Sequence, residues 1–254
     1  VTVNVSDVDE PSKANHLVDL NATVNLEMIW VEPGTFTMGS PTTEAGRGTD
    51  EAEHNVTLTK GFYLGKYEVT QAQYEAVMMG NTEGLSATPS QFSGNPNRPV
   101  EKVSWNNVQV FLARLNAVEQ AAGRLNAGWS YVLPTESEWE YACRAGTTTA
   151  YSWGNDINAS HANWNYGNDA NQTVNVGQYA ANPWGFHDMH GNVFEWTVDS
   201  YQAAYPTGTV IDPVEEGDGL PTYLRNDRVL RGGAWSFGGE SLRSAARPMN
   251  EHVQ

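Results

Sequence analysis

"DMHGNVFEW", residues 188–196, places two carboxylates inside an otherwise apolar and aromatic stretch. Asp188 and Glu195 stand close to Phe186, Phe194 and Trp196 in the sequence. Burying unpaired carboxylates in such surroundings is unfavourable, and a bound divalent cation would offset that cost. The alternative is that Asp188 caps a turn while Glu195 faces solvent. The stretch therefore poses a choice between a metal site and an ordinary turn.

The composition describes a globular, strongly acidic chain. Its 254 residues are 39% hydrophobic and include nine Trp and eleven Tyr, enough to fill a sizeable core. The net charge of −16 argues against nucleic acid and anionic membranes as partners, because binding to phosphates needs clustered Lys and Arg. No run of 18 apolar residues occurs, so we expect no membrane insertion. The only cysteine, Cys143, excludes an intramolecular disulfide.

The first residues favour a separate segment. "VTVNVSDVDEP" alternates apolar and polar residues and then breaks at Pro11, which predicts a strand leading into a linker. It resembles the last strand of the cadherin-like repeats of large bacterial surface proteins. The chain begins at Val1 without a signal peptide, so we expect a fragment or mature product of an exported protein. We predict a strand and linker over residues 1–23, a main domain over residues 24–254, and an extracellular or cell-surface location.

The main domain is predicted to be α+β with little regular structure. Capping-box patterns at Thr70 and Thr135 and a capping serine at Ser104 predict the starts of three helices. In the third helix, Trp139, Ala142 and Cys143 would share one buried face. Strands are predicted over residues 56–69, 100–103, 173–179 and 228–235.

Six motifs in a fixed order carry a family resemblance. The chain resembles the formylglycine-generating enzyme family, also called the sulfatase-modifying-factor domain, over about residues 24–254. The resemblance implies an irregular fold related to C-type lectins, with bound calcium. The motifs are "MIWVEPGTFTMGS" (28–40), "YLGKYEVTQAQYEAVM" (63–78), "RPVEKVSWNNVQVFLARLN" (98–116), "LPTESEWEYACRAG" (133–146), "GFHDMHGNVFEWTVDSY" (185–201) and "RVLRGGAWSF…LRSAAR" (228–247).

The resemblance also implies which groups would bind calcium in the opening stretch. In the family, a side chain, two backbone carbonyls and a glutamate surround one ion. By position these ligands are Asp188, Gly191, Val193 and Glu195. The family's usual asparagine is an aspartate here, which should keep or strengthen the affinity for a cation. Calcium prefers such oxygen ligands, so one or two Ca²⁺ ions are the expected cofactors.

A second calcium site is a weaker prediction. Asn163 and Trp164 match the start of the family's second site, and Asn168 and Asp169 are the candidates in a loop that is shorter here. His187 and His190 have a spacing that could suit a transition metal. They lack a suitable third ligand nearby, so we expect neutral surface imidazoles.

The thiolate chemistry of the family is missing. Its oxidation of a sulfatase cysteine relies on two cysteines that bind copper, and residues 232–247 contain none. Cys143 lies on a predicted scaffold helix and cannot replace them. We therefore expect no copper and no formylglycine-generating activity, and we assign no catalytic residue.

The same segment could instead display a ligand-binding surface. The chain resembles proteins whose C-terminal face is diversified by retroelements, which implies recognition of a protein or glycan ligand. Residues 235–250 would form that face. The candidate ligand-binding residues are Trp235, Ser236, Phe237, Glu240, Ser241 and Arg247, and further surface positions are Gly238, Ala246, Pro248 and Met249.

Three functions remain open. The favoured one is an exported, calcium-stabilised module for ligand recognition or surface structure. An oxidoreductase-like enzyme of the family, with a cysteine-independent site and an unknown substrate, is the second. A self-assembling architectural component is the third, because the family's closing "GFR" strand does not follow residue 247 and another chain could pair with the open edge.

Overall fold

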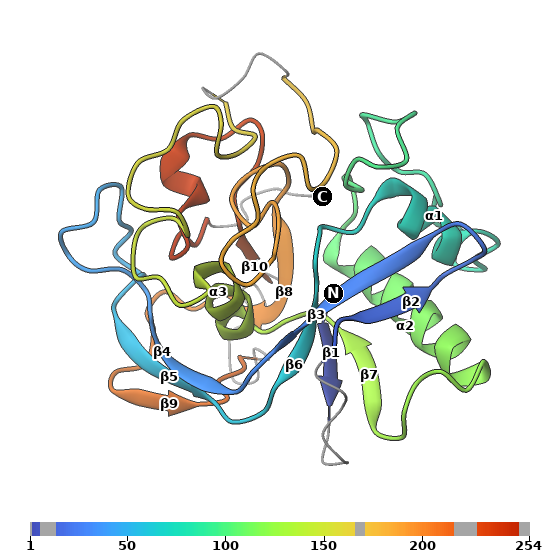
Figure 1. Ribbon diagram of the computed structural model, residues 1–254, viewed down its shortest axis with the longest axis horizontal. Helices are drawn as coiled ribbons and strands as arrows, with labels where there is room; N and C mark the ends of the chain where they lie inside the picture. Colours follow the sequence, from blue (N-terminus) through green and yellow to red (C-terminus); the bar gives the residue numbers. More distant parts are fainter. Residues whose placement is uncertain (1, 6–13, 166–170, 216–227, 249–254) are drawn as a thin grey trace.

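The computed structural model describes residues 2–5, 14–165, 171–215 and 228–248. Its largest sheet has five antiparallel strands in the order β2-β3-β6-β1-β7. Figure 1 shows this sheet near the middle of the molecule, with two helices on one side and a third helix, two smaller sheets and irregular segments on the other. The strands are β1 (Thr2–Val5), β2 (His16–Asp19), β3 (Asn25–Val31), β6 (Phe62–Gly65) and β7 (Trp129–Val132).

The three predicted helices are confirmed as α1 (Gln71–Met78), α2 (Trp105–Ala121) and α3 (Glu136–Arg144). Each begins with a complete capping box, formed by Thr70 with Gln73, Ser104 with Asn107 and Thr135 with Glu138. These reciprocal bonds satisfy N–H groups that a helix start leaves free, so short local patterns suffice to fix where each helix begins.

Two smaller sheets complete the strand structure. β4 (Gly34–Met38), β5 (His54–Leu58) and β9 (Thr209–Ile211) form a three-stranded sheet in which β9 runs parallel to β5. β8 (Glu195–Ser200) and β10 (Arg228–Arg231) form an antiparallel ribbon. The fold is thus α+β with short elements joined by long irregular segments, as predicted.

The apolar residues form three buried clusters. The first joins the five-stranded sheet to α1 and α2, and the second joins α3 to β4, β5 and β6. In the second, Trp139, Ala142 and Cys143 lie together and are fully buried, as predicted for one face of α3. The third cluster is small and packs around Leu242 and Tyr151.

Two of the predicted strands were wrong. Residues 100–103 form none: the Val100 amide bonds to Val69 O, whereas the Glu101 amide bonds to the Ser90 hydroxyl. Residues 173–179 form an irregular segment with a turn at 176–177; the Val174 and Gly177 amides bond to side chains and the Val176 amide bonds to Asn97 O. The predicted strand over 56–69 is two strands, β5 and β6, and the strand over 228–235 is confirmed as the shorter β10.

The first segment takes part in the main sheet. β1 pairs with β6 and β7, and β2 pairs with β3. The strand predicted at the start of the chain is therefore present, and its origin in a preceding repeat stays a prediction. Among the described residues, no helix is long and apolar enough to cross a membrane.

Candidate functional site

Asp188 lies in the loop before β8 and turns inward. Its backbone has φ +58°, a left-handed conformation that is uncommon outside glycine. The side chain is buried, and Oδ2 accepts a hydrogen bond of 2.6 Å from the Gly177 amide. Asp188 therefore accepts a hydrogen bond from a turn, which is part of the alternative to a metal site. It does so in the interior of the protein, however, where a negative charge is unfavourable unless a positive group balances it.

Glu68 is the residue that the sequence reasoning missed. It lies just before α1, and its buried carboxylate contacts the opening stretch although the two are more than 120 residues apart in sequence. Oε1 accepts from the Val193 amide at 3.0 Å, and Oε2 accepts from Asn192 Nδ2 at 2.7 Å. The sequence signal that could have identified Glu68 is that it is the only acid in "YLGKYEVT", where it stands between Tyr67 and Val69.

Glu68, Asp188 and Glu195 form a cluster of carboxylates that affect one another, here called the acidic cluster. Burial, followed by the charges of Asp188 and Glu195, raises the pKa of Glu68 well above its usual range. Burial raises the pKa of Asp188 to about 6. Burial and the charge of Asp188 also raise the pKa of Glu195. In the described part of the chain, no Lys or Arg forms an ion pair with any of the three.

The backbone of the same loop carries further oxygen atoms. Gly191 has φ +107°, and a Cβ there would lie 2.4 Å from Asn163 O, so only glycine fits. Asn192 is left-handed as well, with φ +60°. No described group donates a hydrogen bond to the carbonyl oxygens of Gly191 or Val193. The loop therefore offers two free carbonyls in addition to the carboxylates.

This set of donors fits a hard cation. Calcium takes six to eight oxygens from carboxylates, carbonyls and water, and the cluster supplies only oxygen. Side chains alone do not complete a site, because no group of three His, Cys, Asp or Glu residues in the described ranges lies close enough to hold a metal. The carbonyls of Gly191 and Val193 would supply the missing ligands. The chemistry of these groups suits calcium, and the site predicted from Asp188, Gly191, Val193 and Glu195 stays a prediction, with Glu68 as a further candidate.

The second predicted site cannot be assembled from the described residues. Asn168 and Asp169 lie outside them. The buried Asn163 amide donates to Gln172 O and to Asn192 Oδ1, at 2.9 and 3.2 Å. Trp164 packs against the third apolar cluster. The second site stays a prediction.

The histidine prediction needs a correction. His190 is buried, not on the surface, because its ring hydrogen-bonds to Leu242 O at 2.7 Å and to the Ser152 amide at 3.2 Å. Burial lowers the pKa of His190 to about 4, so the ring is neutral as predicted. His187 is partly buried, and its Nδ1 lies 2.9 Å from Tyr179 O.

Cys143 is an inert thiol. It is fully buried on α3, and its Sγ lies 3.5 Å from His190 Nε2. Burial raises the pKa of Cys143 to about 12, so the thiolate required for nucleophilic or copper chemistry does not form near neutral pH.

The predicted display segment is only partly exposed. Ser236, Phe237 and Glu240 are exposed, Trp235 and Ser241 are half-buried, and Phe237 is 42% exposed. Ala246 is buried, which corrects its prediction as a surface position, and Arg247, predicted as a ligand-binding residue, is buried as well. The Arg247 guanidinium instead binds Glu136 and packs over the Tyr205 ring. Gly238 and Pro248 are half-buried, while Met249 lies outside the described residues.

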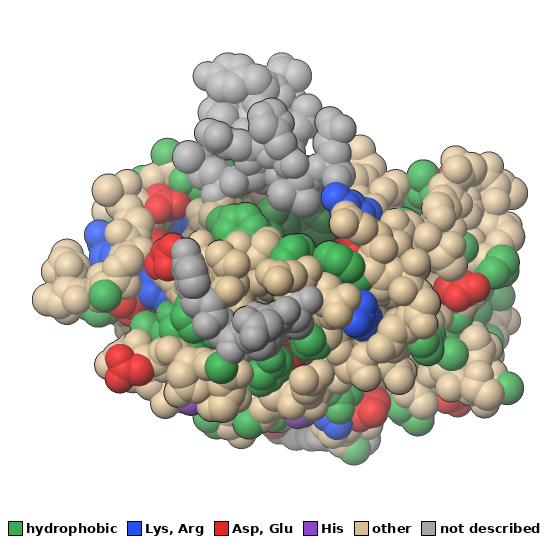
Figure 2. Space-filling view, turned by 90° about the horizontal axis from the view of Figure 1, so that it is seen from above, with side chains coloured by type: hydrophobic (Ala, Val, Ile, Leu, Met, Phe, Trp, Pro, Cys, Tyr) green, Lys and Arg blue, Asp and Glu red, His purple; other side chains and the backbone are tan. Residues whose placement is uncertain are grey.

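Aromatic residues from separate segments meet at this display segment. The Phe237 ring contacts Phe194 edge to face at 4.8 Å, and Trp235 contacts Phe92 in the same way at 5.4 Å. Figure 2 shows the top face of the molecule, where hydrophobic side chains gather near the middle. Exposed aromatic groups of this kind are common in binding surfaces.

Residues 15–254 match the family model described as the sulfatase-modifying factor enzyme 1-like domain. The chain belongs to this family. It is 32% identical to chaperone protein LppX of Paenibacillus barcinonensis, over 69% of this chain and 72% of that protein. It is 34% identical to the formylglycine-generating enzyme of Streptomyces coelicolor, over 58% of this chain and 45% of that enzyme.

Solved structures share the fold of this sulfatase-modifying-factor domain. PvdO from Pseudomonas aeruginosa has a TM-score of 0.72 and 27% identity, covering 95% of this chain and 93% of PvdO. Treponema denticola variable protein 1 has a TM-score of 0.71 and 22% identity, covering 94% of each chain. The chain lacks the cysteine pair of the formylglycine-generating enzymes, since its single cysteine is the buried Cys143.

Proposed function

We propose that this domain is a calcium-stabilised recognition module that does not generate formylglycine. The observation that carries the proposal is the exposed Phe237, which stands in the segment where the active relatives place their cysteines. An aromatic ring on the surface can bind a ligand but cannot bind copper. The scaffold is kept while the reactive groups are replaced by contact groups.

Calcium would have a structural role in this proposal. Glu68, Asp188 and Glu195, with the Gly191 and Val193 carbonyls, would hold the ion, which supplies the positive charge that the acidic cluster lacks. The ion would fix the loop that precedes β8. Phe194 lies in that loop and contacts Phe237, so the metal region and the display segment are in direct contact.

An exported location agrees with this use of calcium. Extracellular modules bind calcium with dissociation constants of about 10⁻⁴ to 10⁻³ M and depend on the high concentration outside cells. The fold similarity to Treponema denticola variable protein 1 supports a display role for the face that carries Trp235 to Ser241. We propose a protein or glycan as the ligand of that face.

Two assays test the proposal. The first incubates the protein with copper, oxygen and a peptide that carries the sulfatase cysteine motif, and we expect no aldehyde by mass spectrometry. Conversion of the peptide would contradict the proposal.

The second assay screens protein and glycan arrays with the wild type and with Phe237→Ala, in calcium. We expect a ligand whose binding falls at least tenfold in the variant, as for a buried aromatic contact at an interface. Leu17→Ala is the control, because Leu17 is 53% exposed on β2 and lies outside the display segment. Equal losses in both variants would contradict recognition by this face.

A further inference from the structure

Five Asn-x-Ser/Thr tripeptides occur in the sequence, and four of them share a further feature. The tripeptide is the acceptor signal for N-linked glycosylation, in which a sugar is attached to the asparagine side chain. Acids make up 30 of the 254 residues, so composition alone would place fewer than one acid at any given position near five tripeptides. Bacterial oligosaccharyltransferases select the longer pattern Asp/Glu-x-Asn-x-Ser/Thr. An acid stands two residues before the asparagine in "DLNAT" (19–23), "EHNVT" (53–57), "DINAS" (156–160) and "DANQT" (169–173).

The first of these motifs lies in the exposed turn that joins β2 to β3. Asn21 Oδ1 accepts hydrogen bonds from the amides of Thr23 and Val24 at 2.9 and 3.0 Å, and from Thr23 Oγ1 at 3.2 Å. A backbone N–H can only donate, so the contacted atom is the oxygen and the remaining atom of the carboxamide is the nitrogen. No described residue accepts a hydrogen bond from Asn21 Nδ2. The nitrogen that carries the sugar in N-glycosylation is therefore free, on an exposed side chain.

Asn158 has the same geometry in a loop that is distant in sequence. Its Oδ1 accepts from the Ser160 amide at 2.9 Å and from Ser160 Oγ at 2.7 Å. No described residue accepts from Asn158 Nδ2. Asp156, Asn158 and Ser160 are all exposed. Asparagine side chains bond readily to the backbone two residues on, so both motifs fold into the same local turn. An enzyme can reach the acid, the asparagine and the hydroxyl of this motif together.

The fold keeps the other two acidic motifs out of reach. Asn55 lies on β5, which is paired with β4 on one side and β9 on the other. Its amide donates to Gly208 O, and Thr57 Oγ1 lies 2.9 Å from Thr35 Oγ1. Such a strand cannot turn outward into an enzyme without breaking its ladder of hydrogen bonds. In the last motif Thr173 is fully buried, so its hydroxyl is inaccessible. The chain thus carries one pattern in two accessible and two inaccessible settings.

We propose that Asn21 and Asn158 are acceptor sites for an N-linked glycan. The donor class is an oligosaccharide joined through C1 of its first sugar to a polyprenyl diphosphate. The carboxamide nitrogen forms a bond to C1, the bond between C1 and the diphosphate oxygen breaks, and the nitrogen gives one proton to a base of the enzyme. Polyprenyl diphosphate is the leaving group. The inference shares only the export of the chain with the proposed function, because this transfer takes place on secreted proteins.

Incubation of the folded full chain with a bacterial oligosaccharyltransferase and its lipid-linked oligosaccharide tests the proposal. Mass spectrometry of proteolytic peptides measures the occupancy of each site. We expect glycan on Asn21 and Asn158, at an occupancy at least tenfold above that of Asn55. A synthetic peptide that contains DLNAT is the control for enzyme activity. Glycosylation of this peptide but of neither asparagine in the folded chain would overturn the proposal, and so would equal occupancy of Asn55 and Asn21. Neither result bears on ligand recognition, because the assay uses purified protein.

Variants at the turn between β2 and β3 separate recognition by the enzyme from the structure of the turn. Thr23→Val and Asp19→Ala should each lower the occupancy of Asn21 about tenfold, whereas Thr23→Ser should retain it. The occupancy of Asn158 in the same molecules is the internal control and should stay at the wild-type value. Melting temperatures should change by no more than about 2 °C, because Asp19 and Thr23 are exposed. Wild-type occupancy of Asn21 in both Thr23→Val and Asp19→Ala would overturn the proposal.

Discussion

The molecule buries carboxylates in two regions and treats them in opposite ways. Around α3, Glu136 and Glu140 are paired with arginines. In the acidic cluster, Glu68, Asp188 and Glu195 have no described arginine or lysine as a partner. The comparison teaches that burial of a carboxylate alone does not identify a site. The missing counter-charge does.

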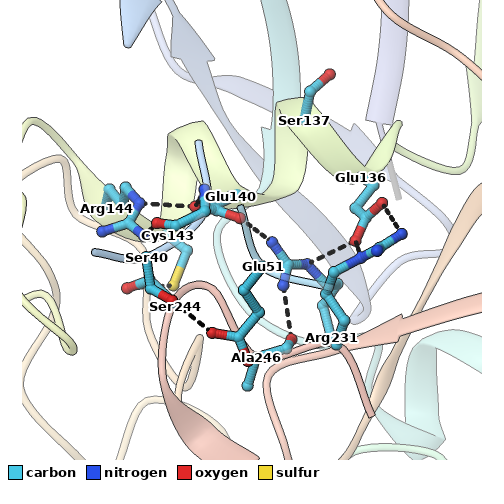
Figure 3. A network of polar contacts seen from close by, with 12 residues as sticks. Ser40, Glu51, Glu136, Ser137, Glu140, Cys143, Arg144, Arg231, Ser244 and Ala246 are labelled. Atoms are coloured by element: carbon cyan, nitrogen blue, oxygen red, sulfur yellow. Dashed lines mark hydrogen bonds and ion pairs between the residues drawn. The ribbon is translucent and has the colours of Figure 1, made fainter. Parts of the chain in front are cut away.

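The paired region is a continuous network that Figure 3 shows from close by. Glu140 lies between Arg144 and Arg231 and contacts both, and Arg231 also lies 3.7 Å from Glu136. The side chains of Glu140 and Arg231 are fully buried. These contacts join α3 to β10 and to the C-terminal segment, because Arg231 also donates to Ala246 O.

The largest expected effect comes from breaking this network. Arg231→Ala removes one of the two buried arginines that contact Glu140, together with a longer contact to Glu136, and should lower the free energy of unfolding by about 3–5 kcal/mol. The loss should be the same with calcium and with chelator. Urea denaturation measures it, with Glu27→Gln as the control, since the partly exposed Lys66–Glu27 pair should contribute about 0–1 kcal/mol. If calcium restored the free energy of unfolding of Arg231→Ala to the wild-type value, the claim that only the acidic cluster depends on calcium would be contradicted.

A second effect is a pH dependence of the calcium-free protein. The raised pKa of Asp188, about 6 against an ordinary 3.8, means that the folded state holds its proton more tightly than the unfolded state. Stability is therefore present at low pH and falls as pH rises from about 4 to 6, by up to about 3 kcal/mol for this group. The raised pKa of Asp199, about 7, extends the fall toward neutral pH.

Urea denaturation in chelator at pH 5 and pH 7.5 measures this dependence. We expect the lower free energy of unfolding at pH 7.5, and we expect saturating calcium to remove the contribution of the acidic cluster. A calcium-free protein that is more stable at pH 7.5 than at pH 5 would show that the cluster already has a counter-charge.

The smallest of the three effects is the change in the free energy of unfolding caused by Glu195→Gln. Its expected sign in chelator is opposite to that for Arg231→Ala. Glu195→Gln removes one charge from the unpaired cluster, so in chelator at pH 7.5 the variant should be at least as stable as the wild type. It should lose the stabilisation by calcium, about 2.7 kcal/mol at a calcium concentration of 100 times Kd. Asp156→Asn, an exposed acid elsewhere, is the control and should retain the response to calcium. A Glu195→Gln variant that is destabilised as strongly as Arg231→Ala would contradict the comparison.

The features predicted correctly from the sequence are those that depend on residues close together in the chain. The three helix starts followed from capping boxes whose partners are three residues apart. The loop between Asp188 and Asn192 has positive φ at Asp188, Gly191 and Asn192, and the Asp188 side chain is buried. The family resemblance supplied the ligand set, and local spacing supports it.

The sequence did not predict what depends on distant partners. Glu68 meets the loop through bonds that span more than 120 residues, and no periodic pattern joins the two. Residues 173–179 were predicted as a strand, but the Val174 and Gly177 amides bond to the side chains of Asn192 and Asp188. Arg247 was predicted as a ligand-binding residue, but it is buried and pairs with Glu136 on α3, a partner that is equally remote in sequence.

The most direct test of the account is thermal melting of the wild type at pH 7.5 in 5 mM calcium and in chelator, with bound metal measured by elemental analysis. The account predicts at least one calcium per chain and a melting temperature several degrees higher with calcium, because the ion binds only the folded acidic cluster. A melting temperature indifferent to chelator, with no calcium in the purified protein, would contradict it.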